Sequence, residues 1–293
     1  MIKKSDYIRT DLAFESEVGA KKAHTVKEDF EGISLSVMTV DSDELSALLK
    51  KQKGQYITIN IGNPCYFGEK ESDRASRCIA KYIKQLAAHH RVALDNVMVV
   101  GLGNRMMTAD ALGPLTVDKT VVTRHIREQD PALFRSVTSS VISAISPGVV
   151  GQTGIETAEL VLGAAERAKP DLVILIDALA ARSCDRLGTT VQLSSSGICP
   201  GSGVGNRRYS IDRDTLGIPV ITVGVPMVVD SSTLVCDVLW RAGIENISDE
   251  ISDVLKNGQS FFVCLRDSDS VAEKCASIIA DALNIAFKND GLS

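Results

Sequence analysis

The sequence predicts an α/β fold, with a mostly parallel or mixed sheet that carries helices on both faces. Nearly continuous apolar runs at Val97–Gly103, Leu172–Ile176 and Pro219–Val225 are typical of strands buried on both faces of a sheet. Amphipathic helical patterns alternate with these runs, which favours parallel strands. The chain has 293 residues, 44% of them hydrophobic, and is long enough for a large core.

The remaining elements follow from periodicity and from end signals. The charged, non-periodic stretch up to about Glu31 predicts an extended or mobile arm. Two runs that alternate with period two, Ser34–Val40 and Tyr56–Gly62, predict strands, and further strands are expected at Val137–Ile145 and Phe261–Leu265. Helices are predicted at Ala75–Ala87 with Asp73 as its cap, Leu112–Ile126, Glu156–Lys169, Ser231–Ala242 and Ser270–Phe287.

Charge and cysteine content argue against several classes of protein. A net charge of -5 and a pI near 5.5 disfavour a protein that holds nucleic acid by its own charge. The seven cysteines are scattered without a Cys-x-x-Cys motif, which indicates free thiols in a reducing compartment. The sequence lacks a secretory signal and a run of about eighteen apolar residues that could span a membrane. A soluble cytoplasmic protein that does not bind a membrane is therefore expected.

Two aspartates, Asp110 and Asp177, stand where apolar strands pass into polar loops. A buried charge without a partner is costly, and ligands of open α/β sheets bind just past the carboxyl ends of strands. A carboxylate pair can hydrolyse a peptide bond when one member takes a proton from water and the other, protonated, polarises the carbonyl. A structural explanation is also open, in which Asp110 caps the following helix and Asp177 binds loop amides.

Other standard constellations are missing or incomplete. The four histidines form no His-Glu-x-x-His motif, and there is no Gly-x-Ser-x-Gly elbow. The loop at Gly101-Leu-Gly103 lacks the third glycine of a dinucleotide fingerprint. The glycine-rich segment 200–208 is either a flexible turn or a backbone cradle that grips a peptide chain.

Five sequence blocks carry a resemblance to a known family. They are Gly101–Asn104 with Thr108–Pro114, Pro147–Thr157, Ile176–Arg182, Gly197–Arg208 and Gly224–Asp230. At these blocks the chain resembles the germination proteases, or spore proteases, of endospore-forming Firmicutes. The resemblance implies an endopeptidase that degrades small acid-soluble spore proteins as spores germinate. It also implies a fold similar to that of hydrogenase-maturation endopeptidases, Asp110 and Asp177 as the catalytic pair, no cofactor or metal, a homotetramer, and a place in the forespore or spore core.

The resemblance also gives the N-terminal segment a function. Family members are made as zymogens, and their substrates are cut in sequences similar to Thr-Glu-Phe/Ile-Ala-Ser-Glu, after the first acid. The segment Thr10-Asp11-Leu12-Ala13 is similar to that sequence, and more acids follow. We therefore expect self-cleavage between Asp11 and Leu12, with residues 1–11 as propeptide and 12–293 as one protease domain. The alternative is an unstructured tail.

An acidic substrate sequence calls for a basic subsite. Arg182, Arg207 and Arg208 flank the predicted site, and a guanidinium suits a carboxylate, while Gly201 and Gly203 would supply backbone contacts. Two rival functions stay open at this point: a nickel-dependent maturation endopeptidase and a non-enzymatic nucleotide-binding protein.

Overall fold

The computed structural model describes residues 9–15, 23–138, 140–199, 209–244, 248–257 and 261–288. Within them, nine strands form one sheet in the order β1-β2-β3-β7-β8-β6-β4-β5, and β9 pairs with the end of β8. The strands are β1 (His24–Phe30), β2 (Ile33–Val40), β3 (Gly54–Asn60), β4 (Asn96–Gly101), β5 (Val141–Ile145), β6 (Leu172–Ala181), β7 (Thr190–Ser194), β8 (Val220–Asp230) and β9 (Phe262–Val263).

The sheet is mixed, which confirms the predicted fold class. Strands β8, β6, β4 and β5 are parallel, whereas β1, β2, β3 and β7 pair antiparallel, and β7 joins the two halves by pairing with β8. Every residue of β6 except Ala178 is buried, as expected for a central strand covered on both faces.

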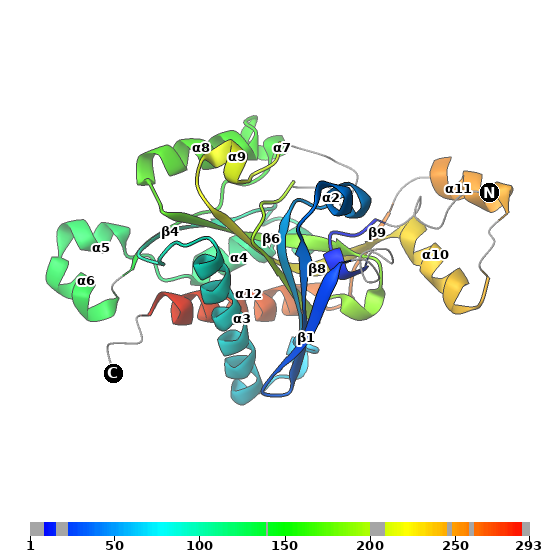
Figure 1. The fold of residues 1–293 in the computed structure, drawn as a ribbon, viewed down its shortest axis with the longest axis horizontal. Helices are drawn as coiled ribbons and strands as arrows, with labels where there is room; N and C mark the ends of the chain where they lie inside the picture. The colour runs from blue at the N-terminus through cyan, green and yellow to red at the C-terminus, as the bar shows by residue number, and fades with distance from the viewer. Residues whose placement is uncertain are drawn as a thin grey trace.

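Helices cover both faces of this sheet (Figure 1). Alternate side chains of a strand point to opposite faces, so Val99 packs with α3 and α12, whereas its neighbour Met98 packs with α8. The helices are α2 (Asp43–Leu49), α3 (Glu69–His89), α4 (Leu112–Lys119), α5 (Arg124–Gln129), α6 (Pro131–Val137), α7 (Val150–Thr153), α8 (Thr157–Ala168), α9 (Arg213–Leu216), α10 (Ser231–Arg241), α11 (Asp249–Asn257) and α12 (Ser268–Phe287).

The expectation of an extended or mobile arm up to Glu31 is wrong for His24–Phe30, which forms the edge strand β1. A two-residue turn joins β1 to β2, and both of its residues, Glu31 and Gly32, have positive φ (52° and 84°). Such turns suit the twist of a hairpin. Charged side chains on an exposed edge strand hide its periodicity and also discourage pairing with other chains.

The helix predicted over Leu112–Ile126 is two helices, α4 and α5. The chain leaves the helical path because Thr123 bonds to β5 instead: its N–H donates to the Ile142 carbonyl at 2.9 Å, and its hydroxyl donates to the Ser140 carbonyl at 2.7 Å. The strand predicted to begin at Val137 begins at Val141, because α6 occupies the preceding residues.

Helix α3 begins at Glu69, earlier than predicted, so Asp73 is not its cap. The Asp73 carboxylate lies inside the helix and accepts a hydrogen bond from Arg77 at 2.9 Å. Helices α2, α6, α7, α9 and α11 and strand β7 have no counterpart among the predicted elements, because each is short or polar in sequence.

The strand register brings the site residues together. Gly101 at the end of β4 pairs with Ile176, so Asp177 follows at the carboxyl end of the parallel pair. Across the sheet, Gly224 of β8 pairs with Asp177 on one side and with Gln192 of β7 on the other. Asp177 and Gln192 therefore face the same side of the sheet, at a separation of about 10 Å between Cα atoms, two strand spacings.

Candidate active site

Asp110 ends a short 3-10 turn, η4 (Thr108–Asp110), in the loop that follows β4. Its Oδ2 accepts the N–H of Asn104 at 2.8 Å, which ties the carboxylate to its own loop. Gly103 has a φ of 110°, and the loop passes close to it. A Cβ on residue 103 would lie 2.1 Å from the Asp110 carbonyl oxygen. Only glycine fits this approach. Helix α4 starts after Ala111 with no side-chain cap, so Asp110 does not serve as its N-cap.

Asp177 is 7% exposed, and its Oδ1 accepts the N–H of the next residue, Ala178, at 3.0 Å. Burial raises the pKa of Asp177 well above its usual value, and the nearby carboxylates of Asp110 and Asp11 raise it further. Three carboxyl groups from separate parts of the chain therefore gather here: Asp177 from within β6, Asp110 from the loop after β4, and Asp11 from the N-terminal segment. The expectation that Asp177 stands at the end of its strand is wrong, because pairing with β8 extends β6 as far as Ala181.

The described N-terminal segment, residues 9–15, is docked on the sheet. The Asp11 N–H donates to the Ala180 carbonyl at 2.8 Å, and the Ala180 N–H donates to Asp11 Oδ2 at 2.9 Å. Leu12 is fully buried in a cluster of apolar side chains: Leu179, Ala181, Leu187 and Val229. The bond that the sequence predicts to be cut thus lies against the strand that carries Asp177.

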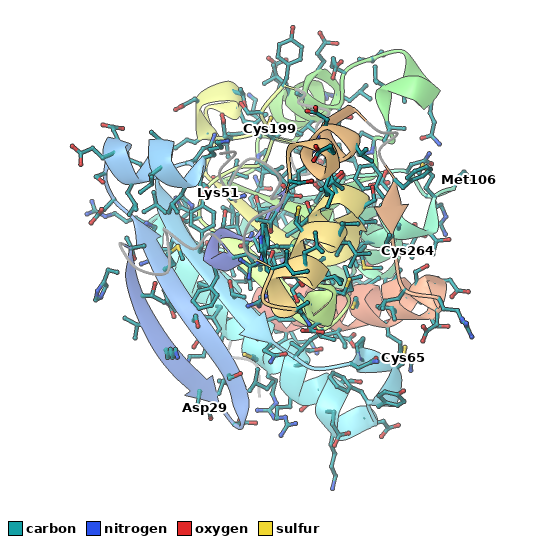
Figure 2. All side chains as sticks on the ribbon, turned by 90° about the vertical axis from the view of Figure 1, so that its right-hand side faces the viewer. Asp29, Lys51, Cys65, Met106, Cys199 and Cys264 are labelled. Atoms are coloured by element: carbon teal, nitrogen blue, oxygen red, sulfur yellow. The ribbon has the colours of Figure 1, made fainter. Side chains whose placement is uncertain are left out.

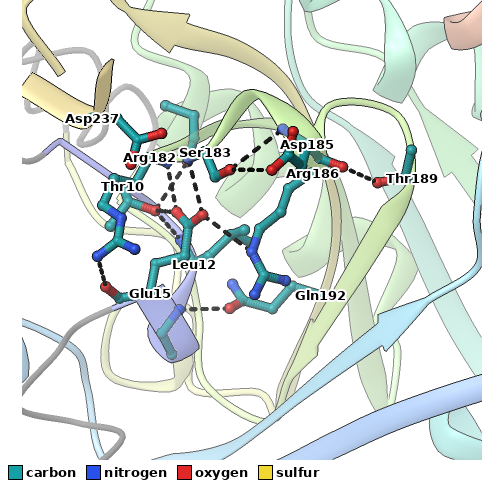
Figure 3. A network of polar contacts seen from close by, with 12 residues as sticks. Thr10, Leu12, Glu15, Arg182, Ser183, Asp185, Arg186, Thr189, Gln192 and Asp237 are labelled. Atoms are coloured by element: carbon teal, nitrogen blue, oxygen red, sulfur yellow. Dashed lines mark hydrogen bonds and ion pairs between the residues drawn. The ribbon is translucent and has the colours of Figure 1, made fainter. Parts of the chain in front are cut away.

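Glu15 enters a pocket of hydrogen-bond donors (Figure 3). Its side chain is 2% exposed and lies in the 3-10 turn η2 (Ala13–Glu15). The carboxylate accepts the N–H of Arg182 at 2.6 Å and of Ser183 at 3.1 Å, and the Thr10 hydroxyl at 2.5 Å. The Arg186 Nε lies 3.2 Å from the carboxylate and supplies the opposite charge. The pocket is therefore built for an acidic side chain.

The predicted basic residues take different places. Arg182 contacts Glu15 through its backbone, and its guanidinium NH1 lies 3.4 Å from the Glu15 carbonyl oxygen. Arg186 in the 3-10 turn η5 (Cys184–Arg186), which sequence reasoning missed, makes the ion pair. Arg207, Arg208, Gly201 and Gly203 lie outside the described residues.

The carbonyl oxygen of Asp11 has two side-chain donors. Lys51 Nζ lies 2.8 Å from this oxygen, and Gln192 Nε2 lies 3.1 Å from it. Burial lowers the pKa of Lys51, while the carboxylates of Asp11 and Glu15 act in the opposite direction. Sequence reasoning missed both residues, although a glutamine between the apolar Val191 and Leu193 is a detectable signal.

A cavity of about 720 Å³ adjoins this carbonyl group. Lys51, Gln192 and Leu179 line it together with Thr222 and Cys199. Lys51 and Cys199, which both line this cavity, are labelled in the upper part of Figure 2. There is therefore space beside the Asp11 carbonyl for water or for a longer peptide.

The described ranges lack a metal-binding cluster and a membrane-spanning helix. They contain no group of three His, Cys, Asp or Glu side chains placed to hold a metal ion. No helix in the same ranges is long and apolar enough to cross a bilayer. The seven cysteines, all within the described ranges, form no disulfide.

An α/β sheet with buried carboxylates beside a docked peptide segment suits an enzyme that cuts peptide chains. A family model described as germination protease matches residues 8–241. A germination protease of Caldanaerobacter subterraneus subsp. tengcongensis is 41% identical over 287 residues, 96% of this chain and 86% of its own. That of Clostridium acetobutylicum is 36% identical over 290 residues, 94% of this chain and 85% of its own. The chain belongs to the germination protease family and is a peptidase.

Among solved structures, the NiFe hydrogenase maturation protease HycI from Thermococcus kodakarensis matches with a TM-score of 0.36 and 16% identity, over 69% of this chain and 98% of its own. The hydrogenase maturating endopeptidase HybD from E. coli matches with a TM-score of 0.26 and 15% identity, over 59% of this chain and 99% of its own.

Proposed function

We propose that this chain is the zymogen of an endopeptidase that cuts its own Asp11–Leu12 bond and then degrades small acid-soluble spore proteins during germination. Residues 1–11 are the propeptide, and residues 12–293 are the protease domain. One observation carries the proposal: the Asp11 carboxylate lies close enough to Asp177 to raise its pKa, while the Asp11 carbonyl is held by two side-chain donors. A peptide bond presented to a carboxylate pair in this way is placed as a substrate.

Asp110 and Asp177 supply the acid–base chemistry. The raised pKa of Asp177 makes it the member that keeps the proton. Asp110 takes a proton from a water molecule, and the water oxygen adds to the carbonyl carbon of Asp11. When the C–N bond breaks, Asp177 delivers its proton to the Leu12 nitrogen. The acid and base are then restored by exchange with water.

The Glu15 pocket supports the substrate class. Glu15 follows Asp11 by four residues, and the same spacing separates the two acids of the family's substrate sequence, Thr-Glu-Phe/Ile-Ala-Ser-Glu. A spore protein that presents this sequence would place its second acid on Arg186 and the two backbone donors. We assign this pocket as the acidic subsite of the enzyme.

Cleavage also explains how the site becomes free for other substrates. The new N-terminus at Leu12 carries an amine that is charged near neutral pH, at a position that is fully buried in the zymogen. Loss of the propeptide removes Thr10, which donates to Glu15 and accepts the Leu12 N–H. Burying the new charge without these partners is unfavourable, so the segment from Leu12 to Glu15 leaves the site.

The family gives the setting of this activity. We place the enzyme in the cytoplasm of the forespore and then in the spore core, where its substrates are stored. We further propose a homotetramer that needs no cofactor and binds spore proteins rather than nucleic acid or membrane, in keeping with its net charge of -5.

Incubation of the full-length protein at mildly acidic pH tests the proposal, with the mass measured over time. We expect a loss that matches residues 1–11, and no loss in Asp110→Asn or Asp177→Asn. Asp171→Asn is the matched control, because Asp171 is exposed just before β6. Self-cleavage that survives both substitutions would rule out the aspartate pair.

A further inference from the structure

We propose that Lys51 and Gln192 are catalytic residues that bind the carbonyl oxygen of the bond to be cut and stabilise the negative charge that forms on it. This inference rests on the proposed cleavage between Asp11 and Leu12. As water adds to the Asp11 carbon, the electron pair of the C=O bond moves onto the oxygen. That pair re-forms the C=O bond when the bond to the Leu12 nitrogen breaks.

The two donors have the geometry that this task requires. Their distances to the Asp11 oxygen, 2.8 Å from Lys51 Nζ and 3.1 Å from Gln192 Nε2, are those of an oxyanion site. They come from different parts of the chain, the turn after α2 and the centre of β7, and neither belongs to the docked segment. The site therefore exists independently of the propeptide and can serve a substrate in trans.

Gln192 holds the backbone on both sides of Leu12. Its Nε2 donates to the carbonyl before Leu12, and its Oε1 accepts the N–H of Ala13 at 2.8 Å. The pair of contacts fixes the orientation of the amide, so that its NH₂ group faces the carbonyl. Both contacts are to backbone atoms, so they are independent of the side chain that follows the cut.

Lys51 brings a charge, which strengthens the hydrogen bond to a developing oxyanion. The turn at the end of α2 sets its position: Lys50 has a φ of 53°, and the Ser46 hydroxyl donates to the Lys51 carbonyl at 2.6 Å. The side chain is half-buried, and Asp11 and Glu15 are the carboxylates that face it. A cation in such surroundings interacts more strongly with a new negative charge than one in water does.

The arrangement places the acid and the oxyanion donors around one bond. Asp177 and Gln192 face the same side of the sheet, and between them stands Gly224, where a Cβ would lie 2.6 Å from the Leu179 side chain. The missing side chain at Gly224 leaves room for Leu179, which packs against Leu12 and so supports the peptide between the proton donor and the amide donor.

The test compares the full-length wild type with Lys51→Met, Gln192→Glu and the control Lys53→Met. Methionine keeps the length of the Lys51 stem without its charge, and the change from amide to carboxylate in Gln192→Glu keeps the acceptor for Ala13 while losing the donor. Lys53 is exposed and pairs with Asp43 on the surface. The rate of release of residues 1–11 is measured by mass, and hydrogen exchange at Asp11 and Ala13 reports whether the segment stays docked.

We expect Lys51→Met and Gln192→Glu each to slow release about 10²- to 10³-fold with amide protection retained, and Lys53→Met to match the wild type. Rates within threefold of the control would overturn the proposal, and so would an equal loss of amide protection, which would indicate docking alone. If Lys51→Met does not fold, the release rate and amide protection of Gln192→Glu test the proposal. A wild type that releases a fragment other than residues 1–11 refutes the proposed cleavage itself, and this inference falls with it.

Discussion

Asp11 and Ala180 exchange two hydrogen bonds, one through the Asp11 N–H at 2.8 Å and one through the Asp11 carboxylate at 2.9 Å. The side chain of Asp11 thus takes the place of a strand carbonyl beside β6. An acid before the cut is therefore bound through its shape and hydrogen-bonding capacity as well as through its charge.

This pairing predicts that Asp11→Ala slows self-cleavage by about tenfold or more. The substitution leaves the Ala180 N–H without its acceptor, which costs about 1–3 kcal/mol. Asp11→Asn keeps a carbonyl oxygen that can accept the Ala180 N–H. Its rate of self-cleavage should therefore lie between the rates of Asp11→Ala and the wild type. The order of the three rates is measured by monitoring the mass of the chain as the N-terminal fragment is released. An Asn variant slower than Ala would contradict this explanation.

Asp177→Asn should abolish cleavage and raise stability at neutral pH. Because burial raises the folded-state pKa of Asp177, its contribution to stability is fully present below the unfolded pKa of about 3.9 and is lost as the pH rises through the folded value. An asparagine side chain does not titrate, so the variant loses no stability in this way as the pH rises. The Tm advantage of the variant should therefore be small near pH 4 and grow towards pH 8, by about 2–4 °C for each kcal/mol relieved.

Thermal unfolding across this pH range checks the prediction, on chains shown by mass to retain residues 1–11. A Tm difference that does not change with pH would show that the Asp177 carboxyl does not titrate as its burial implies.

Glu15→Gln should weaken docking of the N-terminal segment by about 1.5–3 kcal/mol, because the Arg186 ion pair and the charge-assisted bonds to Arg182 and Ser183 are lost. Faster hydrogen exchange at residues 11–13 and slower self-cleavage are the expected results. Asp185→Asn is the control, since Asp185 pairs with Arg241 on the surface. A peptide in trans whose second acid is replaced by Gln should likewise show about a tenfold higher KM, with kcat retained.

Gly224→Ala should destabilise the protein by about 1–3 kcal/mol and slow cleavage. Its Cβ would lie 2.6 Å from the Leu179 side chain, which packs against Leu12, so the buried contact becomes overpacked. Gly163→Ala in α8 is the contrasting control, because no atom outside its own stretch of helix lies within 4 Å of its Cβ and alanine favours a helix. Denaturant unfolding measures the free energy of unfolding of both variants. Equal values for Gly224→Ala and Gly163→Ala would show that Leu179 can move aside.

Much of the fold could be predicted because local patterns agree with the final packing. The run at β6 is apolar since both faces of that strand are covered, and the helical repeat at 75–87 lies within α3. Prediction failed where long-range contacts override local preference. Thr123 ends a helical path by bonding to β5, and the charged β1 is a strand because β2 pairs with it.

The sequence by itself determined the α/β class, the two candidate aspartates and the similarity of the N-terminal segment to a substrate, because these features depend on residue type and spacing along the chain. That Asp177 lies inside β6 and not at its end depends on pairing with β8. Only the tertiary structure decided which groups meet the Asp11–Leu12 bond. Lys51 comes from the turn after α2, whereas Gln192 and Arg186 come from β7 and η5, more than 130 residues further along the chain. Sheet pairing and helix packing bring such residues together, and no periodicity along the chain encodes their meeting.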